Sequence, residues 1–212
     1  MIALITGATG ATGRDLVQLL LQDNQYTIIV IFVRRPIGIS APKLFEVLTD
    51  FDNLEQVAGF IKGDVWFSCL GTTRKAAGSK EQQWHVDYGI PVKFAEIAKK
   101  NGIASVVLLS AYGASPDSNV FYSKMKGKLE ERIGALAFER HIIFRPGLLL
   151  RKGSSRVGER VFAALLRLLN KLGIARKFKP LPTSLLAGKL AKAPKVLGPG
   201  KHIVALDEIF SF

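Results

Sequence analysis

Three side chains in the middle of the sequence have the types and spacing needed for proton transfer coupled to hydride transfer. Ser110 ends an apolar run, Tyr122 follows twelve residues later, and Lys126 lies four residues beyond the tyrosine. Residues i and i+4 of a helix share one face, so Tyr122 and Lys126 can point into one crevice. A neighbouring ammonium favours the phenolate of a tyrosine, whose ordinary pKa is about 10. We predict that Ser110 positions a substrate oxygen and that Tyr122 is the acid/base.

A glycine-rich turn near the start of the chain supplies the second chemical signal. Gly7, Gly10 and Gly13 are spaced as Gly-x-x-Gly-x-x-Gly, directly after an apolar run and at the start of a helical pattern. Glycines permit a tight turn and a close approach of the backbone to a pyrophosphate, and the helix N-terminus favours phosphate. Many α/β turns use glycine without binding a ligand, so position in the chain carries the interpretation. The expected cofactor-binding residues of this turn are Gly7, Thr9, Gly10, Ala11, Thr12, Gly13 and Arg14.

The basic pair Arg34-Arg35, at the end of the second apolar run, indicates which dinucleotide is bound. An acidic residue at this place suits the ribose 2′-hydroxyl of NAD, whereas arginine suits the 2′-phosphate of NADP. We therefore predict NADP, with NADPH preferred over NADH; the alternative is an ordinary solvated basic pair. Asp50 and Phe51 follow the third run and are predicted to hold the adenine, although Asp50 could equally form a turn or cap a helix.

These residues need a scaffold of alternating strands and helices. Short apolar runs predict strands at Ile2–Ile5, Thr27–Val33, Leu44–Leu48, Val65–Leu70, Ser105–Ser110, His141–Phe144 and His202–Leu206. Helical patterns lie at Gly10–Leu21, Leu54–Ile61, Glu81–Lys100, Phe121–Phe138, Gly158–Leu172 and Ser184–Ala193. Continuous rather than alternating apolar runs are typical of a parallel sheet that is covered on both faces. Within the third helical pattern, Pro91 either starts a fresh segment or kinks a continuous helix.

The predicted fold class is thus α/β, a doubly wound Rossmann fold with a mostly parallel sheet. Residues 1–212 are expected to form a single NAD(P)-binding domain, in which 152–200 make a small, basic C-terminal region on the substrate side. Cys69 is the only cysteine, which excludes an intrachain disulfide. The first residues lack a basic leader and no apolar stretch reaches the ~18 residues of a membrane span, so we expect a cytoplasmic protein. No metal-ligand spacing is present, and Cys69, His85 and His141 are interpreted as structural.

The net charge of +13 is concentrated in one part of the chain. Residues 1–123 carry 11 basic and 11 acidic side chains, whereas residues 124–212 carry 19 basic and 6 acidic ones. This surplus is interpreted as the solvated face of a surface helix, with a membrane-surface helix or an oligomer contact as alternatives. Nucleic-acid binding is not expected, because the charges are not interleaved with aromatic side chains. The predicted partner is a small carbonyl or alcohol substrate, and the protein is expected to be a monomer or a homodimer.

Several longer motifs are similar to those of an atypical branch of the short-chain dehydrogenase/reductase superfamily, the branch of the Tat-interacting-protein-like oxidoreductases. They are Cys69–Gly78, Val86-Asp87, Leu109–Ala114, Tyr122–Glu130 and Phe144–Gly147. The resemblance implies a Ser110/Tyr122/Lys126 triad in which Tyr122 and Lys126 also contact the cofactor, Lys126 at the nicotinamide ribose. The other cofactor contacts that it implies are Leu70, Gly71, Thr72, Arg145, Pro146 and Gly147.

One departure from the superfamily pattern bears on the mechanism. Asp87 stands where an asparagine is expected in the helix after the fourth strand, which removes support for a proton relay through an amide at that position. The favoured function is an NADP-dependent oxidoreductase acting on a small carbonyl or alcohol. The alternative is an NADP-binding regulatory or partner-binding protein without turnover. Nucleotide-sugar epimerase or dehydratase activity is less favoured, because those enzymes have a longer C-terminal part.

Overall fold

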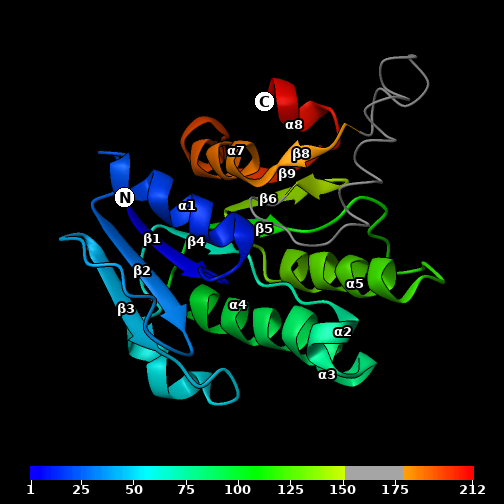
Figure 1. The fold of residues 1–212 in the computed structure, drawn as a ribbon, viewed down its shortest axis with the longest axis horizontal. Helices are drawn as coiled ribbons and strands as arrows, with labels where there is room; N and C mark the ends of the chain where they lie inside the picture. Colours follow the sequence, from blue (N-terminus) through cyan, green and yellow to red (C-terminus); the bar gives the residue numbers. More distant parts are fainter. Residues whose placement is uncertain (151–178) are drawn as a thin grey trace.

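A computed structural model describes residues 1–150 and 179–212 (Figure 1). Its centre is a seven-stranded sheet of order β3-β2-β1-β4-β5-β6-β9, in which every neighbouring pair is parallel. The strands are β1 (Ile2–Thr6), β2 (Ile28–Val33), β3 (Leu44–Leu48), β4 (Val65–Ser68), β5 (Ser105–Leu109), β6 (Arg140–Arg145) and β9 (Gly200–Ala205). The prediction of a doubly wound, mostly parallel Rossmann sheet is confirmed.

Helices cover both faces of this sheet, as Figure 1 shows. One face carries α1 (Ala11–Gln22), α7 (Thr183–Val196) and the short α8 (Glu208–Ser211). The opposite face carries α4 (Ile90–Lys100), α5 (Phe121–Ala135) and a 3₁₀ helix at Leu54–Phe60. The central strands are buried on both sides, which explains why their sequences read as continuous apolar runs.

Each face has its own hydrophobic core. On the α1/α7 face, Leu16 and Leu20 of α1 pack with Leu186 and Leu190 of α7 over the sheet. On the other face the largest buried groups are aromatic: the ring of Phe94 stacks on Trp66 with 4.9 Å between ring centroids. Two cores of this kind fix the helices on both sides, so the carboxyl ends of the strands are held in a defined arrangement.

The segment from residue 72 to 100 departs most from the sequence prediction. A helical pattern was expected at Glu81–Lys100, and the structure has α2 (Arg74–Ala77), followed by α3 (Lys80–Trp84), a π-helical turn at His85–Gly89 and α4, the last three without a break. Pro91 lies in the first turn of α4, directly after the π-helical turn, and Gly89 and Ile90 before it keep helical dihedral angles, so the chain does not leave the helix at the proline. The wider turn shifts the helical register at Asp87, and such turns often occur at functional sites.

The C-terminal part differs from expectation in smaller ways. The predicted helix at Ser184–Ala193 is observed as α7, and the predicted helix at Gly158–Leu172 lies outside the described residues. α2, α8 and a two-stranded pair of β7 (Leu149–Leu150) with β8 (Leu181–Pro182) were not expected, because such short elements leave no periodic pattern. Among the described residues, none of the helices combines the length and the apolar character that crossing a membrane requires.

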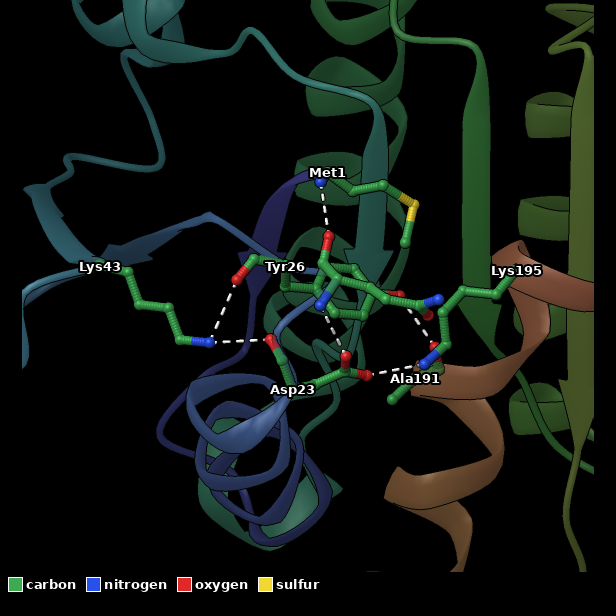
Figure 2. A network of polar contacts seen from close by, with 7 residues as sticks. Met1, Asp23, Tyr26, Lys43, Ala191 and Lys195 are labelled. Atoms are coloured by element: carbon green, nitrogen blue, oxygen red, sulfur yellow. Dashed lines mark hydrogen bonds and ion pairs between the residues drawn. The ribbon is translucent and has the colours of Figure 1, made fainter.

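A polar network at the amino ends of the strands ties the α1 and α7 segments together (Figure 2). The buried Tyr26 hydroxyl donates to the Ala191 carbonyl at 2.8 Å, and Lys195 pairs with Asp23 at 2.6 Å. Lys43 donates to the main-chain carbonyls of Asp23 and Tyr26. We call Asp23, Tyr26, Lys43, Ala191 and Lys195 the amino-end network.

Candidate active site

The predicted site residues gather at the carboxyl ends of β1, β4 and β5, the edge of the sheet opposite to the amino-end network. The strand order reverses between β1 and β4, which is the point where ligands bind in open α/β sheets. β1 ends at Thr6 and the chain passes through the glycine-rich turn into α1. The helix therefore begins at this crevice, and the N–H groups of its first turn have no partner within the helix.

The tight geometry of this turn requires glycine at two positions. Gly7 adopts a φ of +81°, and a Cβ atom there would lie 2.5 Å from the carbonyl carbon of Cys69. A Cβ at Gly13 would overlap the Gly7 carbonyl oxygen. Gly10 caps α1, and its N–H donates to the Gly7 carbonyl at 3.0 Å. The turn thus brings α1 close to β1 and aims the helix N-terminus at the crevice.

Three arginines line one cavity beside the turn. Arg14 reaches it from α1, and Arg34 and Arg35 reach it from the end of β2, with Thr9 on its floor. Arg34 and Arg35 are exposed and neither has a carboxylate partner among the described residues. Three guanidinium groups with free donors around one cavity suit a doubly charged phosphate.

A second cavity continues from the arginines toward the carboxyl end of β3. Phe32, Asp50, Phe51 and His85 are among its lining residues. Asp50 accepts hydrogen bonds from the side chain of Asn53 and the N–H of Asp52, and these bonds hold the pKa of its carboxyl below the usual range. Asp50 therefore stabilises a turn, which is the second of its two expected roles, and it also lines the cavity.

Ser110, Tyr122 and Lys126 line a common pocket with the N-terminus of α1. Ser110 follows β5, whereas Tyr122 and Lys126 project from α5. Tyr122 is 41% exposed and its hydroxyl has no hydrogen-bond partner among the described residues. Lys126 is 2% exposed, and its Nζ donates to the Leu109 carbonyl over a long 3.5 Å. The tyrosine hydroxyl is free to move a proton, and a buried cation lies on the same side of the helix.

Asp87 is a buried acid next to this lysine. Its Oδ1 accepts from the Thr72 N–H at 2.7 Å, while its Oδ2 has no hydrogen-bond partner in the described part of the chain. Burial raises the pKa of Asp87, and the Lys126 charge and the Thr72 N–H oppose that rise only in part. Burial likewise raises the pKa of the Cys69 thiol to about 12, which makes Cys69 a poor nucleophile.

Ser110 is hydrogen-bonded to a second buried acid, Glu130. The Ser110 hydroxyl donates to Glu130 Oε1 at 2.5 Å. Arg145 donates to the same carboxylate through two nitrogens, Nε at 3.0 Å and Nη2 at 2.5 Å. This contact with Glu130 raises the pKa of Arg145 above its usual value. The three residues connect the ends of β5 and β6 with the middle of α5.

The comparisons with known proteins agree with this geometry. A family model described as NAD(P)H-binding matches residues 7–160. The chain belongs to this NAD(P)H-binding family. Within it, the chain is 35% identical over 215 residues to a mitochondrial FMP52 protein of Debaryomyces hansenii, covering 97% of this chain and 94% of that one. It is 37% identical over 160 residues to the HTATIP2 protein of Rattus norvegicus, covering 73% of this chain and 66% of that one.

Solved structures place the fold among Rossmann-type proteins. The structure of MoeE5 in complex with UDP-glucuronic acid and NAD superposes with a TM-score of 0.73 at 18% identity, covering 97% of this chain and 76% of that one. The expected cytoplasmic localisation is wrong, because the FMP52 relatives are named as mitochondrial proteins, those of Eremothecium gossypii and Saccharomyces cerevisiae included. The sequence interpretation failed because it took the composition of the first residues as a sign of the cytoplasm.

The crevice of this NAD(P)H-binding protein fits a nicotinamide dinucleotide. Most of the predicted residues line its three cavities: Gly7, Thr9, Gly10, Ala11, Thr12, Arg14, Arg34, Arg35, Asp50, Phe51, Leu70, Gly71, Thr72, Ser110, Tyr122 and Lys126. Gly13 instead packs inside the turn, and Pro146 and Gly147 do not line these cavities. Arg145, predicted as a cofactor contact, is also absent from their lining and binds Glu130.

Sequence reasoning missed several residues of the site. Thr73, Ala76, Leu109 and Leu149 line the pocket of the triad. Glu130 was overlooked because Lys126 and Glu130 are four residues apart on a helix, which normally indicates a surface ion pair. Glu130 lies four residues after Lys126 and eight after Tyr122, so it shares their helix face, and its burial follows from packing rather than from any signal in the sequence.

Proposed function

We propose that the protein is an NADP-dependent oxidoreductase that transfers hydride to or from a small carbonyl or alcohol. The observation that carries the proposal is that Ser110, Tyr122 and Lys126 share one pocket with the phosphate-binding end of α1. Membership of the NAD(P)H-binding family supports the cofactor. The substrate oxygen would lie beside Tyr122, which has a hydroxyl open to the pocket.

The division of labour among the side chains follows from their surroundings. When bound, the nicotinamide would supply or accept the hydride. Tyr122 would give a proton to the substrate oxygen in reduction and take it back in oxidation. The buried Lys126 ammonium would stabilise the negative charge that develops on the Tyr122 oxygen when the proton leaves. Asp87 lies beside Lys126, and burial raises its pKa, which disfavours the charged carboxylate that would compensate the lysine.

The preference for NADP rests on the cavity of three arginines. A 2′-phosphate there would receive charge-assisted hydrogen bonds from Arg14, Arg34 and Arg35, whereas NAD would leave those guanidinium groups without an anion. The residue at the end of β2 is Arg34, whereas an NAD site would carry a carboxylate there to bind the ribose.

The deciding experiment is a titration of the purified protein with NADPH and NADH, followed by energy transfer from Trp66 and Trp84 to the reduced nicotinamide. We expect tighter binding of NADPH, and a loss of about 10–100-fold in NADPH affinity, with little change for NADH, in Arg34→Ala. Arg132→Ala is the matched control, because Arg132 pairs with Glu96 on the surface of α5. Equal affinity of the wild type for both nucleotides would contradict the NADP preference.

A second candidate function is NADP binding without turnover. It is favoured by one observation: the Ser110 hydroxyl is already bound to Glu130 and is not free to donate to a carbonyl oxygen. A screen of carbonyl compounds with NADPH, and of alcohols with NADP, separates the two candidates. Turnover that is lost in Tyr122→Phe supports the oxidoreductase, whereas tight NADPH binding with no turnover of any compound supports the second candidate.

A further inference from the structure

Ser110 has an unusual environment for a serine that faces a reaction pocket. Its hydroxyl hydrogen is directed at Glu130, a carboxylate that is 3% exposed and is held by two hydrogen bonds from Arg145. The guanidinium donates to both oxygens of this carboxylate, and a carboxylate only accepts hydrogen bonds. The Ser110 hydroxyl therefore donates its hydrogen to Glu130. Hydrogen bonds to a carboxylate are among the stronger hydrogen bonds in proteins.

The orientation of the hydroxyl determines what Ser110 can do on its other side. Ser110 and Tyr122 line the same pocket, and with its hydrogen turned toward Glu130 the Ser110 hydroxyl has only lone pairs left for a ligand there. It can accept a hydrogen bond from a ligand but cannot donate one to a carbonyl oxygen. The pocket thus offers two different oxygens: the Tyr122 hydroxyl, free to donate, and Ser110 Oγ, set to accept.

A substrate that matches both oxygens needs an acceptor and a donor side by side. We infer that the site selects carbonyl compounds that carry a hydroxyl on the neighbouring carbon, with the carbonyl oxygen at Tyr122 and the hydroxyl donating to Ser110 Oγ. The corresponding alcohols are vicinal diols. Glu130 and Arg145 act as positioning residues that make Ser110 an acceptor. This inference rests on the proposed oxidoreductase function for its kinetic readout, concerns recognition only, and leaves the proton transfer at Tyr122 unchanged.

A simple ketone would bind less well for a definite reason. Its single oxygen would occupy the Tyr122 position, and the Ser110 lone pairs would then face carbon and hydrogen without a donor. A polar group left without a partner in a closed site discriminates strongly against the ligand that fails to pair with it. The arrangement therefore predicts specificity for the hydroxyl rather than general affinity for carbonyls.

The first experiment compares 3-hydroxybutan-2-one with butan-2-one as substrates with NADPH. We expect the hydroxyketone to have a kcat/KM at least about 100-fold higher. In Ser110→Ala this advantage should fall to below about tenfold. In the double variant Glu130→Met/Arg145→Met, which leaves no buried charge unpaired, the KM for the hydroxyketone should rise and its kcat/KM advantage over butan-2-one should likewise fall to below about tenfold.

The pattern across the two ketones separates positioning from mere structural support. A purely structural role of Glu130 would lower both activities together. Glu96→Gln is the matched control, since Glu96 of α4 pairs with the exposed Arg132 of α5 and lines none of the three cavities described above, and it should leave the ratio unchanged. Equal kcat/KM values of the wild type for both ketones would overturn the inference while the proposed function stands.

A second measurement does not depend on turnover. Proton NMR of protein labelled at serine should show a slowly exchanging, downfield hydroxyl resonance that is lost in Ser110→Ala and in the double variant. Thermal shifts in the presence of NADP should be larger with butane-2,3-diol than with butan-2-ol. If no ketone turns over but these two signals are present, the proposed function fails and the assignment of Ser110 as acceptor holds. Absence of both signals in the wild type overturns the inference even if the double variant fails to fold.

Discussion

An aspartate, a tyrosine and a lysine lie together at each end of the sheet, and the two sets are used in opposite ways. In the amino-end network, Tyr26 is fully buried and its hydroxyl is bound to a main-chain carbonyl (Figure 2). Lys195 pairs with Asp23, and its Nζ lies 5.6 Å from the centre of the Tyr26 ring. Burial raises the pKa of Tyr26 well above 10, so this phenol keeps its proton.

At the carboxyl ends of the strands the same three residue types lack such partners. The hydroxyl of Tyr122 and one carboxylate oxygen of Asp87 have no hydrogen-bond partner in the part of the chain that the structure describes. Among the described residues, Lys126 makes one hydrogen bond, the long contact to the Leu109 carbonyl. A side chain whose hydrogen-bonding groups all have partners stabilises the fold, whereas one with an unpaired donor or acceptor can bind a ligand or transfer a proton. The difference between the two regions therefore lies in their partners, because the residue types are the same.

The tyrosines give the largest expected difference. Tyr122→Phe should lower kcat by about 10²–10⁴-fold, because it removes the acid/base, with the free energy of unfolding nearly unchanged. Tyr26→Phe should leave kcat unchanged and cost about 1–2 kcal/mol, because the Ala191 carbonyl loses its buried donor. Steady-state kinetics and urea unfolding of both variants test this. A large loss of activity in Tyr26→Phe without unfolding would break the comparison.

The lysines should follow the same division with a smaller effect. Lys126→Met should reduce kcat by about 10–100-fold, since the charge that develops on the Tyr122 oxygen loses its neighbouring cation. Lys195→Met should reduce only stability, by about 1 kcal/mol, because the ion pair with Asp23 is partly exposed. Steady-state kinetics and urea unfolding of both variants distinguish the two roles, and an unchanged kcat in Lys126→Met would count against its role.

The aspartates should change stability in opposite directions. The pKa of Asp87 in the folded protein lies above its ordinary value of 3.8. Its contribution to the free energy of unfolding is therefore complete below pH 3.8 and is lost as the pH rises through the folded pKa. Asp87→Asn avoids this loss and should stabilise the protein at pH 7 by about 1–2 kcal/mol. Urea unfolding between pH 4 and 7 should show a flatter curve for the variant than for the wild type. A variant less stable than the wild type at pH 7 would refute the buried neutral acid.

Asp23 provides the matched case. Burial raises its pKa, but the hydrogen bonds from Lys195 and from the Gln25 N–H, with the charges of Lys195 and Lys43, outweigh burial and lower it. Its stabilising contribution is present above pH 3.8 and is lost as the pH falls through the folded value. Asp23→Asn should therefore be less stable at pH 7 by up to about 1 kcal/mol and equal to the wild type in acid. The same unfolding series measures both aspartates.

Most of the fold could be predicted because it depends on long apolar runs. The seven strands of the sheet were expected within a residue or two of where they are observed, and the glycine-rich turn fixed where α1 begins. The π-helical turn at His85–Gly89 could not be predicted, because its residues are ordinary helix formers and one extra residue per turn leaves no mark in the composition. Short elements such as α2 were missed for the same reason.

The site was predictable where chemistry depends on spacing and not where it depends on burial. The Tyr122–Lys126 interval and the strand-end serine can be read from the sequence. By contrast, the burial of Glu130 and the binding of Arg145 to it follow from the packing of α5 against the ends of β5 and β6. A charged residue on a helix is usually solvated, so its sequence gives no sign that this one faces inward.

The residues assigned to proton transfer and to substrate recognition all lie in one continuous segment. β5, α5 and β6 follow one another along the chain from Ser105 to Arg145, whereas the glycine-rich turn and the three arginines of the adjacent cavity come before residue 36. A β-α-β unit of this kind is a complete supersecondary motif. The residues proposed to select the cofactor and those proposed to select the substrate therefore lie in separate segments of the sequence. Each segment can diverge, or be exchanged between relatives, while the other is retained.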